Sequence, residues 1–243
     1  MNVQVFENRE MMGATAALDV AEALRIALAQ KAGVRMIFAA APSQAQMLAG
    51  LCAAPDIDWA RVTAFHMDEY IGLAPAAPER FAKWLDDNLF VRVPFGQVHR
   101  IVPEPDPAAA AARYADLLAA APIDLVCLGI GVNGHIAFND PPVADFSDPQ
   151  DVKIVTLDDE CRQQQVDDKC FATFDAVPEQ AITLTVPRLL RADKLFCVVP
   201  GRLKRDAVRA TLHDPISTKS PATILREHPA CTLYLDAESD PDA

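Results

Sequence analysis

The sequence is short of basic residues, with 22 lysines and arginines against 34 aspartates and glutamates in 243 residues. The resulting net charge of −12 argues against nucleic acid or an anionic membrane surface as a partner, because both would repel an acidic protein. A small anionic substrate is still compatible with this charge. A few local cations or backbone N–H groups decide such binding.

Paired cysteine motifs are also missing. The six cysteines are scattered, and no CxxC or zinc-finger spacing occurs among positions 52, 127, 161, 170, 197 and 231. Cys127, Cys197 and Cys231 fall inside apolar, strand-like runs, where cysteine behaves as a small hydrophobic residue. This usage favours a reducing compartment over a disulfide framework, and we expect a cytoplasmic protein.

No stretch has the composition of a signal peptide or of a membrane span. The N-terminal segment lacks the basic and apolar regions of a secretory signal. Residues 36–55 carry no charge, but Pro42, Ser43, Gln44 and Gln46 interrupt their apolar character. We therefore expect strand, turn and helix over this stretch, and no membrane partner.

Strand-like and helix-like segments alternate along the whole chain. We expect strands at 34–39, 61–65, 123–130, 153–157, 181–186, 194–199 and 231–235, and helices at 8–32, from 41, and at 79–90, 106–121, 158–169, 188–192, 200–212 and 222–226. Such alternation predicts one α/β domain over 1–243, with a mostly parallel, Rossmann-like sheet between two helical layers. A small lid is predicted within 141–175.

The most informative stretch is 125–142, where a buried, apolar run ends in glycines. Gly129, Gly131 and Gly134 let the backbone take unusual angles and approach a ligand closely. Ligands of open α/β sheets usually bind at the carboxyl ends of strands. We therefore expect the site here, although a glycine-rich turn with a capping histidine is a structural alternative. The polar residues of the stretch are Asn133, His135, Asn139 and Asp140.

A second polar cluster, residues 66–73, follows the strand predicted at 61–65. Two adjacent acids, Asp68 and Glu69, belong to it, and adjacent acids are also common on solvated loops. Carboxylate and imidazole groups can both be tuned to exchange protons near neutral pH. The two strand ends together therefore predict general acid–base chemistry by Asp68 and His135.

Two further features suit an anion. Residues 41–44 open a helix with a first-turn proline, and the exposed N–H groups and the hydroxyl of Ser43 form an anion site there. A plain capped turn is the alternative. Lys204 follows a Pro-Gly turn at another helix start and is able to hold a phosphate as a point charge, although a solvated surface lysine is the more common case.

Three other chemistries are disfavoured. No GxSxG elbow occurs, so serine-nucleophile chemistry has no support. The set His66, Asp68, His135 and Asp140 has metal-ligand types but no short helical ligand pair, and we expect no metal. The glycines of 129–134 lie mid-chain with no acidic strand end about 20 residues on, so no dinucleotide or other cofactor is expected.

The segments 65–73 (FHMDEYIGL) and 129–141 (GIGVNGHIAFNDP), in this order and at this separation, resemble the glucosamine-6-phosphate deaminase (isomerase) family. The similarity runs over most of the chain, including 200–204 (PGRLK) and the pair 228–229 (HP). The related 6-phosphogluconolactonases usually carry a GHTASLFP-like ending where this chain has GHIAFNDP. That difference favours the deaminase branch.

The resemblance implies an enzyme that opens a hexose ring, moves a proton between C2 and C1 and releases the 2-amino group as ammonia. It implies that Asp68 is the base that shuttles the proton and that His135 helps open the ring by protonating the ring oxygen. It assigns Asn133 and Asp140 to flanking and orienting that histidine, and it gives Glu69 a supporting role beside the base.

The resemblance also implies a phosphosugar partner and no cofactor. Lys204 matches the family's phosphate-binding lysine, and the binding loops would include Ser43, Gln44 and Gly134. Lys169 corresponds to the position of an arginine on the family's lid, in an alignment that needs a gap. A homo-oligomer is compatible with the sequence.

This chain departs from the family at three places. Asn133 replaces an acid, Asp140 replaces a glutamate, and residues 39–44 (AAAPSQ) replace a glycine-rich phosphate loop. An amide can hold an imidazole in one tautomer, but it cannot stabilise imidazolium by charge. Two alternatives therefore stay open: a 6-phosphogluconolactonase-like hydrolase, and a sugar-phosphate sensor with weak catalysis.

Overall fold

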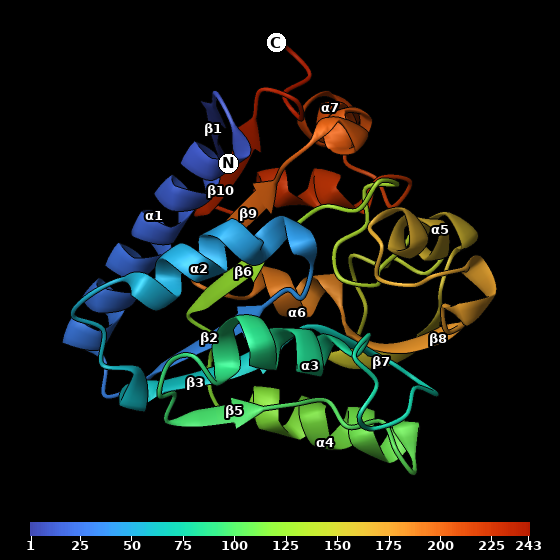
Figure 1. Cartoon of the computed structure of the whole chain (residues 1–243), viewed down its shortest axis with the longest axis horizontal. Coiled ribbons are helices and arrows are strands. Elements are labelled where there is room, and N and C mark those ends of the chain that lie inside the picture. Colours follow the sequence, from blue (N-terminus) through green and yellow to red (C-terminus); the bar gives the residue numbers. More distant parts are fainter.

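The central element of the computed structural model, which describes residues 1–243, is a seven-stranded sheet in which every neighbouring pair of strands is parallel. The strands follow in the order β1 (Asn2–Phe6), β10 (Cys231–Asp236), β9 (Lys194–Val199), β6 (Leu125–Leu128), β2 (Val34–Phe38), β3 (Val62–His66) and β5 (Gln97–His99). Both termini of the chain lie near the β1 edge (Figure 1).

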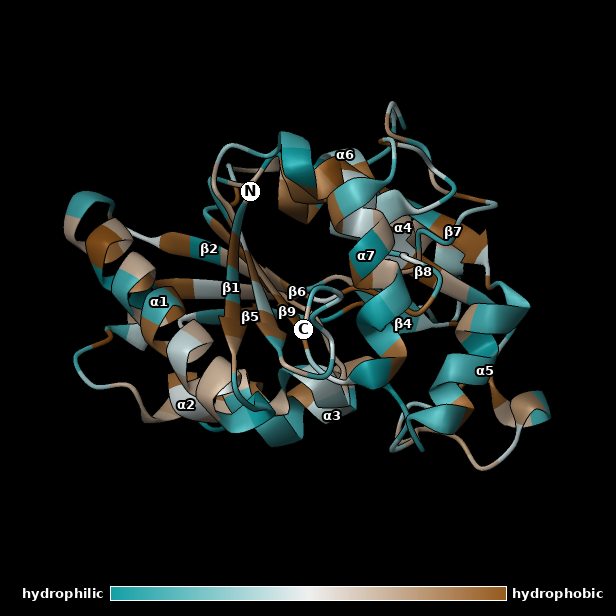
Figure 2. Cartoon of the chain, turned by 90° about the horizontal axis from the view of Figure 1, so that it is seen from above, coloured by the Kyte–Doolittle hydropathy of each residue, from teal (hydrophilic) through white to brown (hydrophobic).

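Helices cover both faces of this sheet (Figure 2). One layer consists of α1 (Arg9–Gln30), α2 (Ala45–Ala53) and α3 (Phe81–Leu85), with the π-helical turn η3 (Asp86–Phe90). The other consists of α4 (Pro107–Ala119), α6 (Val186–Leu190), α7 (Arg205–His213) and the 3-10 helix η6 (Pro221–Glu227). The chain also has four short 3-10 turns: η1 (Pro42–Gln44), η2 (Trp59–Arg61), η4 (Phe174–Ala176) and η5 (Arg202–Lys204).

The central strands divide their side chains between two hydrophobic cores. In β2, Met36 and Phe38 pack into the core beneath α1 and α2, whereas Ile37 packs into the core beneath α4. In β6, Cys127 joins the first core and Val126 the second. Successive side chains of a strand point to opposite faces, so a strand covered on both sides has to be apolar throughout. The predicted three-layer α/β fold is confirmed.

A second, antiparallel sheet lies at one end of the molecule and was not predicted. Its order is β4 (Asp68–Tyr70), β8 (Gln180–Leu184) and β7 (Val152–Thr156), and α5 (Asp159–Asp167) lies beside it (Figure 1). Strand β4 has only three residues, and it is held in the sheet by antiparallel pairing with β8, in which Asp68 lies opposite Thr183. The strand predicted to reach residue 186 ends earlier, because the Thr185 side chain accepts from the amide of Arg188 and caps α6.

The cysteines in strands behave as predicted. Cys127, Cys197 and Cys231 are buried in β6, β9 and β10, and all six cysteines are free. Over the whole chain, the helices are too short or too polar for any of them to cross a bilayer.

Candidate active site

The loops that follow β2, β3, β6 and β9 meet around one cavity of about 150 Å³. The cavity lies at the carboxyl ends of the parallel strands, where ligands of such sheets usually bind. Five residues that the sequence singled out line it: Ser43, Gln44, Asp68, His135 and Lys204.

The loop after β6 owes its shape to two glycines. A Cβ atom on Gly131 would lie 2.1 Å from Cε1 of the His135 ring, so only glycine leaves room for the ring there. Gly134 has a φ of 80°, and a side chain on it would meet Oγ of Ser220 at 2.4 Å. Gly134 therefore shapes the loop but does not line the cavity, where the sequence had placed it as a binding residue.

His135 is held in one orientation by two oxygen acceptors. Its Nδ1 lies 2.8 Å from Oδ1 of Asn133 and 2.9 Å from Oδ1 of Asp140. The side-chain amide of Asn133 is itself oriented, because its Oδ1 accepts from the backbone N–H of His135 and its Nδ2 donates to Asp140 at 3.1 Å. Nδ1 therefore carries the proton in the neutral ring, and Nε2 is left for a ligand.

A third residue, Asp158 at the start of α5, reaches the same group. Its carboxylate makes no cap bond to its own helix and instead lies 3.5 Å from Nδ2 of Asn133. Its N–H donates to Oδ2 of Asp140 at 3.4 Å. An amide at position 133 thus donates to two carboxylates, where an aspartate would face both with a like charge.

Asp140 is buried and sits behind His135 without lining the cavity. Burial by itself would raise the pKa of this carboxyl. The hydrogen bond and charge of His135, together with bonds from Asn133 and Asp158, outweigh it and hold the pKa below its ordinary value. Asp140 therefore stays ionised and fixes the imidazole from behind.

Asp68 has the opposite environment. Its side chain is 6% exposed, and no protein group donates a hydrogen bond to its carboxylate. Burial, and then the charges of Glu69 and Asp140, raise the pKa of Asp68 well above its ordinary value. A carboxyl with a raised pKa is a stronger base once it loses its proton, as proton transfer from carbon requires.

Glu69 points away from the cavity, because neighbouring side chains of a strand alternate between faces. Its two oxygens accept from the backbone amides of Phe81 and Ala82 at 3.1 and 3.0 Å, at the start of α3. Burial raises the pKa of Glu69 to about 7, although these amides oppose the shift. The residue ties β4 to the start of α3, where Phe81 lines the cavity, and its charge adds to the raised pKa of Asp68.

Lys204 lies on the cavity wall in η5, at the loop after β9. It forms neither a salt bridge nor a side-chain hydrogen bond within the protein. Burial lowers its pKa to about 8, against the charges of Asp168 and Cys161, which raise it. A half-buried cation without a partner is a natural counterpart for an anionic ligand.

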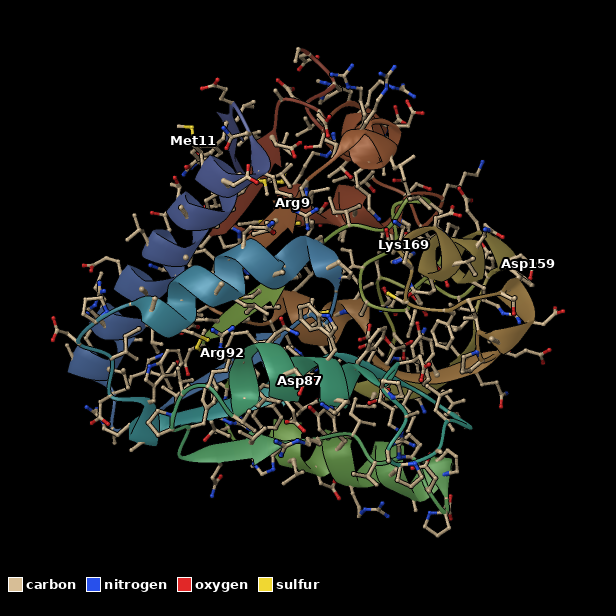
Figure 3. The ribbon with its side chains drawn as sticks, in the orientation of Figure 1. Arg9, Met11, Asp87, Arg92, Asp159 and Lys169 are labelled. Carbon is tan, nitrogen blue, oxygen red and sulfur yellow. The ribbon has the colours of Figure 1, made fainter.

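The predicted lid segment adds cavity residues that the sequence did not reveal. Gln164 and Gln165 of α5 line the cavity, as do Asp168 and Cys170, which follow it. Lys169 between them is exposed and does not line the cavity; Figure 3 shows it next to α5. No sequence signal marks these glutamines, because their place depends on how α5 folds back.

A further cavity residue outside the predicted set is Arg9, the first residue of α1. Figure 3 shows it beside the start of α2. The position of Arg9 could have been noticed in the sequence. A cation at a helix N-terminus is disfavoured by the helix dipole, so its presence there indicates an interaction outside the helix.

The metal set considered from the sequence is not assembled. Nε2 of His66 accepts a hydrogen bond from the amide of Ile101 at 2.8 Å, and burial lowers the pKa of this histidine to about 3. A different trio, His135, Asp140 and Cys161, has potential ligand atoms within 4.8 Å of one another. In it, Nδ1 of His135 is already bonded to Asp140.

Comparison with known proteins agrees with this geometry. Residues 7–234 match the family described as glucosamine-6-phosphate isomerases/6-phosphogluconolactonase. The chain is 38% identical over 183 residues to a glucosamine-6-phosphate deaminase of Exiguobacterium sp., covering 74% of this chain and 69% of that protein. A glucosamine-6-phosphate deaminase of Listeria monocytogenes is 32% identical over 185 residues, covering 76% of this chain and 77% of the relative.

Solved structures show the same fold. A monomeric glucosamine-6-phosphate deaminase superposes with a TM-score of 0.89 at 25% identity, covering 98% of both chains. A 6-phosphogluconolactonase of Thermotoga maritima superposes with a TM-score of 0.76 at 18% identity, covering 97% of this chain and 98% of the other.

Proposed function

Because the chain belongs to the family of glucosamine-6-phosphate isomerases and 6-phosphogluconolactonases, we propose that it is a glucosamine-6-phosphate deaminase. It converts glucosamine 6-phosphate, or a close hexosamine phosphate, and water into fructose 6-phosphate and ammonia. The observation that carries the proposal is one cavity that holds an unpaired carboxyl, an oriented imidazole and an unpaired lysine: Asp68, His135 and Lys204.

The first step is opening of the sugar ring. His135 presents Nε2 to the substrate, because Asn133 and Asp140 occupy Nδ1. An imidazole held in this way moves a proton between the anomeric hydroxyl and the ring oxygen, and the product is the open-chain amino aldehyde. Ionised Asp140 stabilises the imidazolium that forms during the transfer.

The second step is the shift of a proton from C2 to C1. Asp68 takes the C2 proton, which the neighbouring aldehyde acidifies, and returns a proton to C1. The oxygen at C1 gains the proton that the 2-amino nitrogen loses, and the result is an imine at C2. Water adds to this imine, and ammonia leaves as the ketose forms. The absence of protein donors around Asp68 keeps its carboxylate basic enough for this task.

The phosphate ester is bound by Lys204 and the hydroxyl of Ser43, which both line the cavity. Gln44 fixes the loop, since its Nε2 donates to the carbonyl of Val198 at 3.1 Å. The free cysteines favour action in the cytoplasm.

The test is ammonia release from glucosamine 6-phosphate by the purified protein, with galactosamine 6-phosphate and 6-phosphogluconolactone as alternative substrates. We expect ammonia and fructose 6-phosphate in equal amounts from glucosamine 6-phosphate. Sugar acid from the lactone without ammonia from either amino sugar would instead identify a hydrolase. Binding of the amino-sugar phosphates without any turnover would identify a sensor.

A further inference from the structure

The loop that faces the phosphate end of the cavity is poor in backbone donors. Pro42 has no N–H, and the amides of Gln44 and Ala45 are bonded to the carbonyls of Ala41 and Pro42. Within η1, this leaves the N–H of Ser43. A phosphate ester has three strongly accepting oxygens, so further donors have to come from side chains.

Arg9 is placed to supply them. Its Nε donates to Oε1 of Gln46 at 3.0 Å, and its Nη2 donates to the carbonyl of Pro42. These two bonds fix the guanidinium against the loop that carries Ser43. Nη1 has no partner in the protein, and no carboxylate pairs with the residue. Its charge is therefore available to a ligand.

Arg9, at the start of α1, and Lys204, in η5, line the same cavity. The bond from Gln44 to the carbonyl of Val198 ties the loop after β2 to the end of β9, just before the loop that carries Lys204. Asp168 is a carboxylate of the same wall, but its Oδ2 accepts from Gln164 at 3.2 Å on the α5 side. The charge of Asp168 still reaches Lys204, whose pKa it raises, whereas no carboxylate pairs with Arg9.

We propose that Arg9 is a phosphate-recognition residue, which clamps the phosphate ester of the substrate together with Lys204. The proposal rests on the proposed function for the identity of the sugar, but not for the phosphate. Arg9 supplies donors and charge where the proline-containing loop lacks N–H groups. Its place at the start of α1, where the helix dipole opposes it, follows from this role.

The experiment compares Arg9→Ala and Arg9→Lys with wild type, using glucosamine 6-phosphate as substrate and inorganic phosphate as inhibitor. Loss of a charge-assisted hydrogen bond corresponds to a weakening of about tenfold to a hundredfold. We expect KM and the inhibition constant of phosphate to rise together by this factor in Arg9→Ala, with a much smaller change in kcat. Arg9→Lys keeps the charge and should recover part of the affinity.

Arg25→Ala is the matched control. Arg25 lies on the same helix, and its Nε donates to the carbonyl of Pro55 at 3.3 Å, yet it does not line the cavity. We expect it to leave both constants unchanged. If Arg9→Ala does not fold, Arg9→Gln keeps a donor for Pro42 without the charge and takes its place.

Two outcomes separate this inference from the proposed function. Ammonia release by wild type with an unchanged phosphate inhibition constant in Arg9→Ala would overturn the role of Arg9 alone. No ammonia release, but binding of inorganic phosphate that weakens in Arg9→Ala by calorimetry, would overturn the reaction and support Arg9. Equal losses of kcat in the Ala and Lys variants, with phosphate binding intact, would show that Arg9 only holds the loop.

Discussion

At the amino ends of the central strands, buried charges have partners, whereas at the carboxyl ends Asp68 and Lys204 have none. Asp124, just before β6, accepts from the backbone N–H of Arg35 at 2.7 Å and from Nζ of Lys31. Lys31 also donates to Asp193 at 2.8 Å, and these bonds, first that of Asp124, raise its pKa. The pKa values of Asp68 and Lys204 are instead shifted toward their neutral forms by burial.

The difference shows how one sheet serves two purposes. A paired charge at the amino ends stabilises the fold, because the partner replaces the water that burial removes. An unpaired charge at the carboxyl ends costs stability but stays reactive toward a ligand.

The largest effect is expected for Asp68→Asn. The amide has the shape of the carboxyl but accepts no proton, so kcat should fall by about 10²-fold or more. KM should change little, because Lys204, and not Asp68, binds the phosphate ester in the proposed function. Steady-state ammonia release measures both constants. A variant with the wild-type rate would show that another group moves the proton.

Lys204→Ala should act on binding instead. Loss of the cation should raise KM for glucosamine 6-phosphate by about tenfold or more, with a smaller effect on kcat. In wild type, KM should rise as the pH passes about 8, because a lysine with a pKa of about 8 then loses its charge. The pH dependence of KM checks this, and a flat KM between pH 7 and 9 would contradict it.

At the other end of the sheet, Asp124→Asn should change stability and not kinetics. An amide has one acceptor oxygen for two donors and no charge for Lys31, so the unfolding free energy should fall by about 1–3 kcal/mol. Denaturant unfolding measures the change. Asp116→Asn is the control, because Asp116 is exposed and has no side-chain partner. Any loss of kcat at position 124 would break the separation of the two ends.

The smallest effect is expected for Asn133→Asp. The new carboxylate places a negative charge beside the ring of His135, so one limb of the pH profile of kcat/KM should move upward. It also meets Asp140 and Asp158 with a like charge, where the amide donated to both. Stability should therefore fall slightly. An unmoved pH profile would argue that the residue at 133 orients His135 without influencing its charge.

The sequence predicted the parts of the site that are local in the chain. The run from Leu125 to His135 combines a buried strand, glycines and a histidine, so its place at a strand end followed from composition alone. The helical layers followed equally from apolar periodicity. Glu69, predicted to support the base, turns from the cavity and accepts from the amides of Phe81 and Ala82, because neighbouring strand residues face opposite sides.

Other parts depend on contacts between distant segments, which one sequence does not reveal. Asp158 meets Asn133 only because α5 folds back across the loop after β6, and Arg9 meets Pro42 only because α1 starts beside α2. The short strands β4 and β5 have three residues each, too few for an alternation pattern. The edge strand β1 is largely exposed and carries a weak apolar signal.

The most direct test of the contrast between the two ends is the unfolding free energy of Asp68→Asn and of wild type across a pH series. Folding raises the pKa of Asp68, so above about pH 3.8 this group binds more protons in the folded chain than in the unfolded chain, and its contribution to wild-type stability declines as pH rises. At neutral pH the variant should have the larger unfolding free energy, and its difference from wild type should shrink toward pH 4. A variant that is less stable than wild type at neutral pH would contradict the contrast.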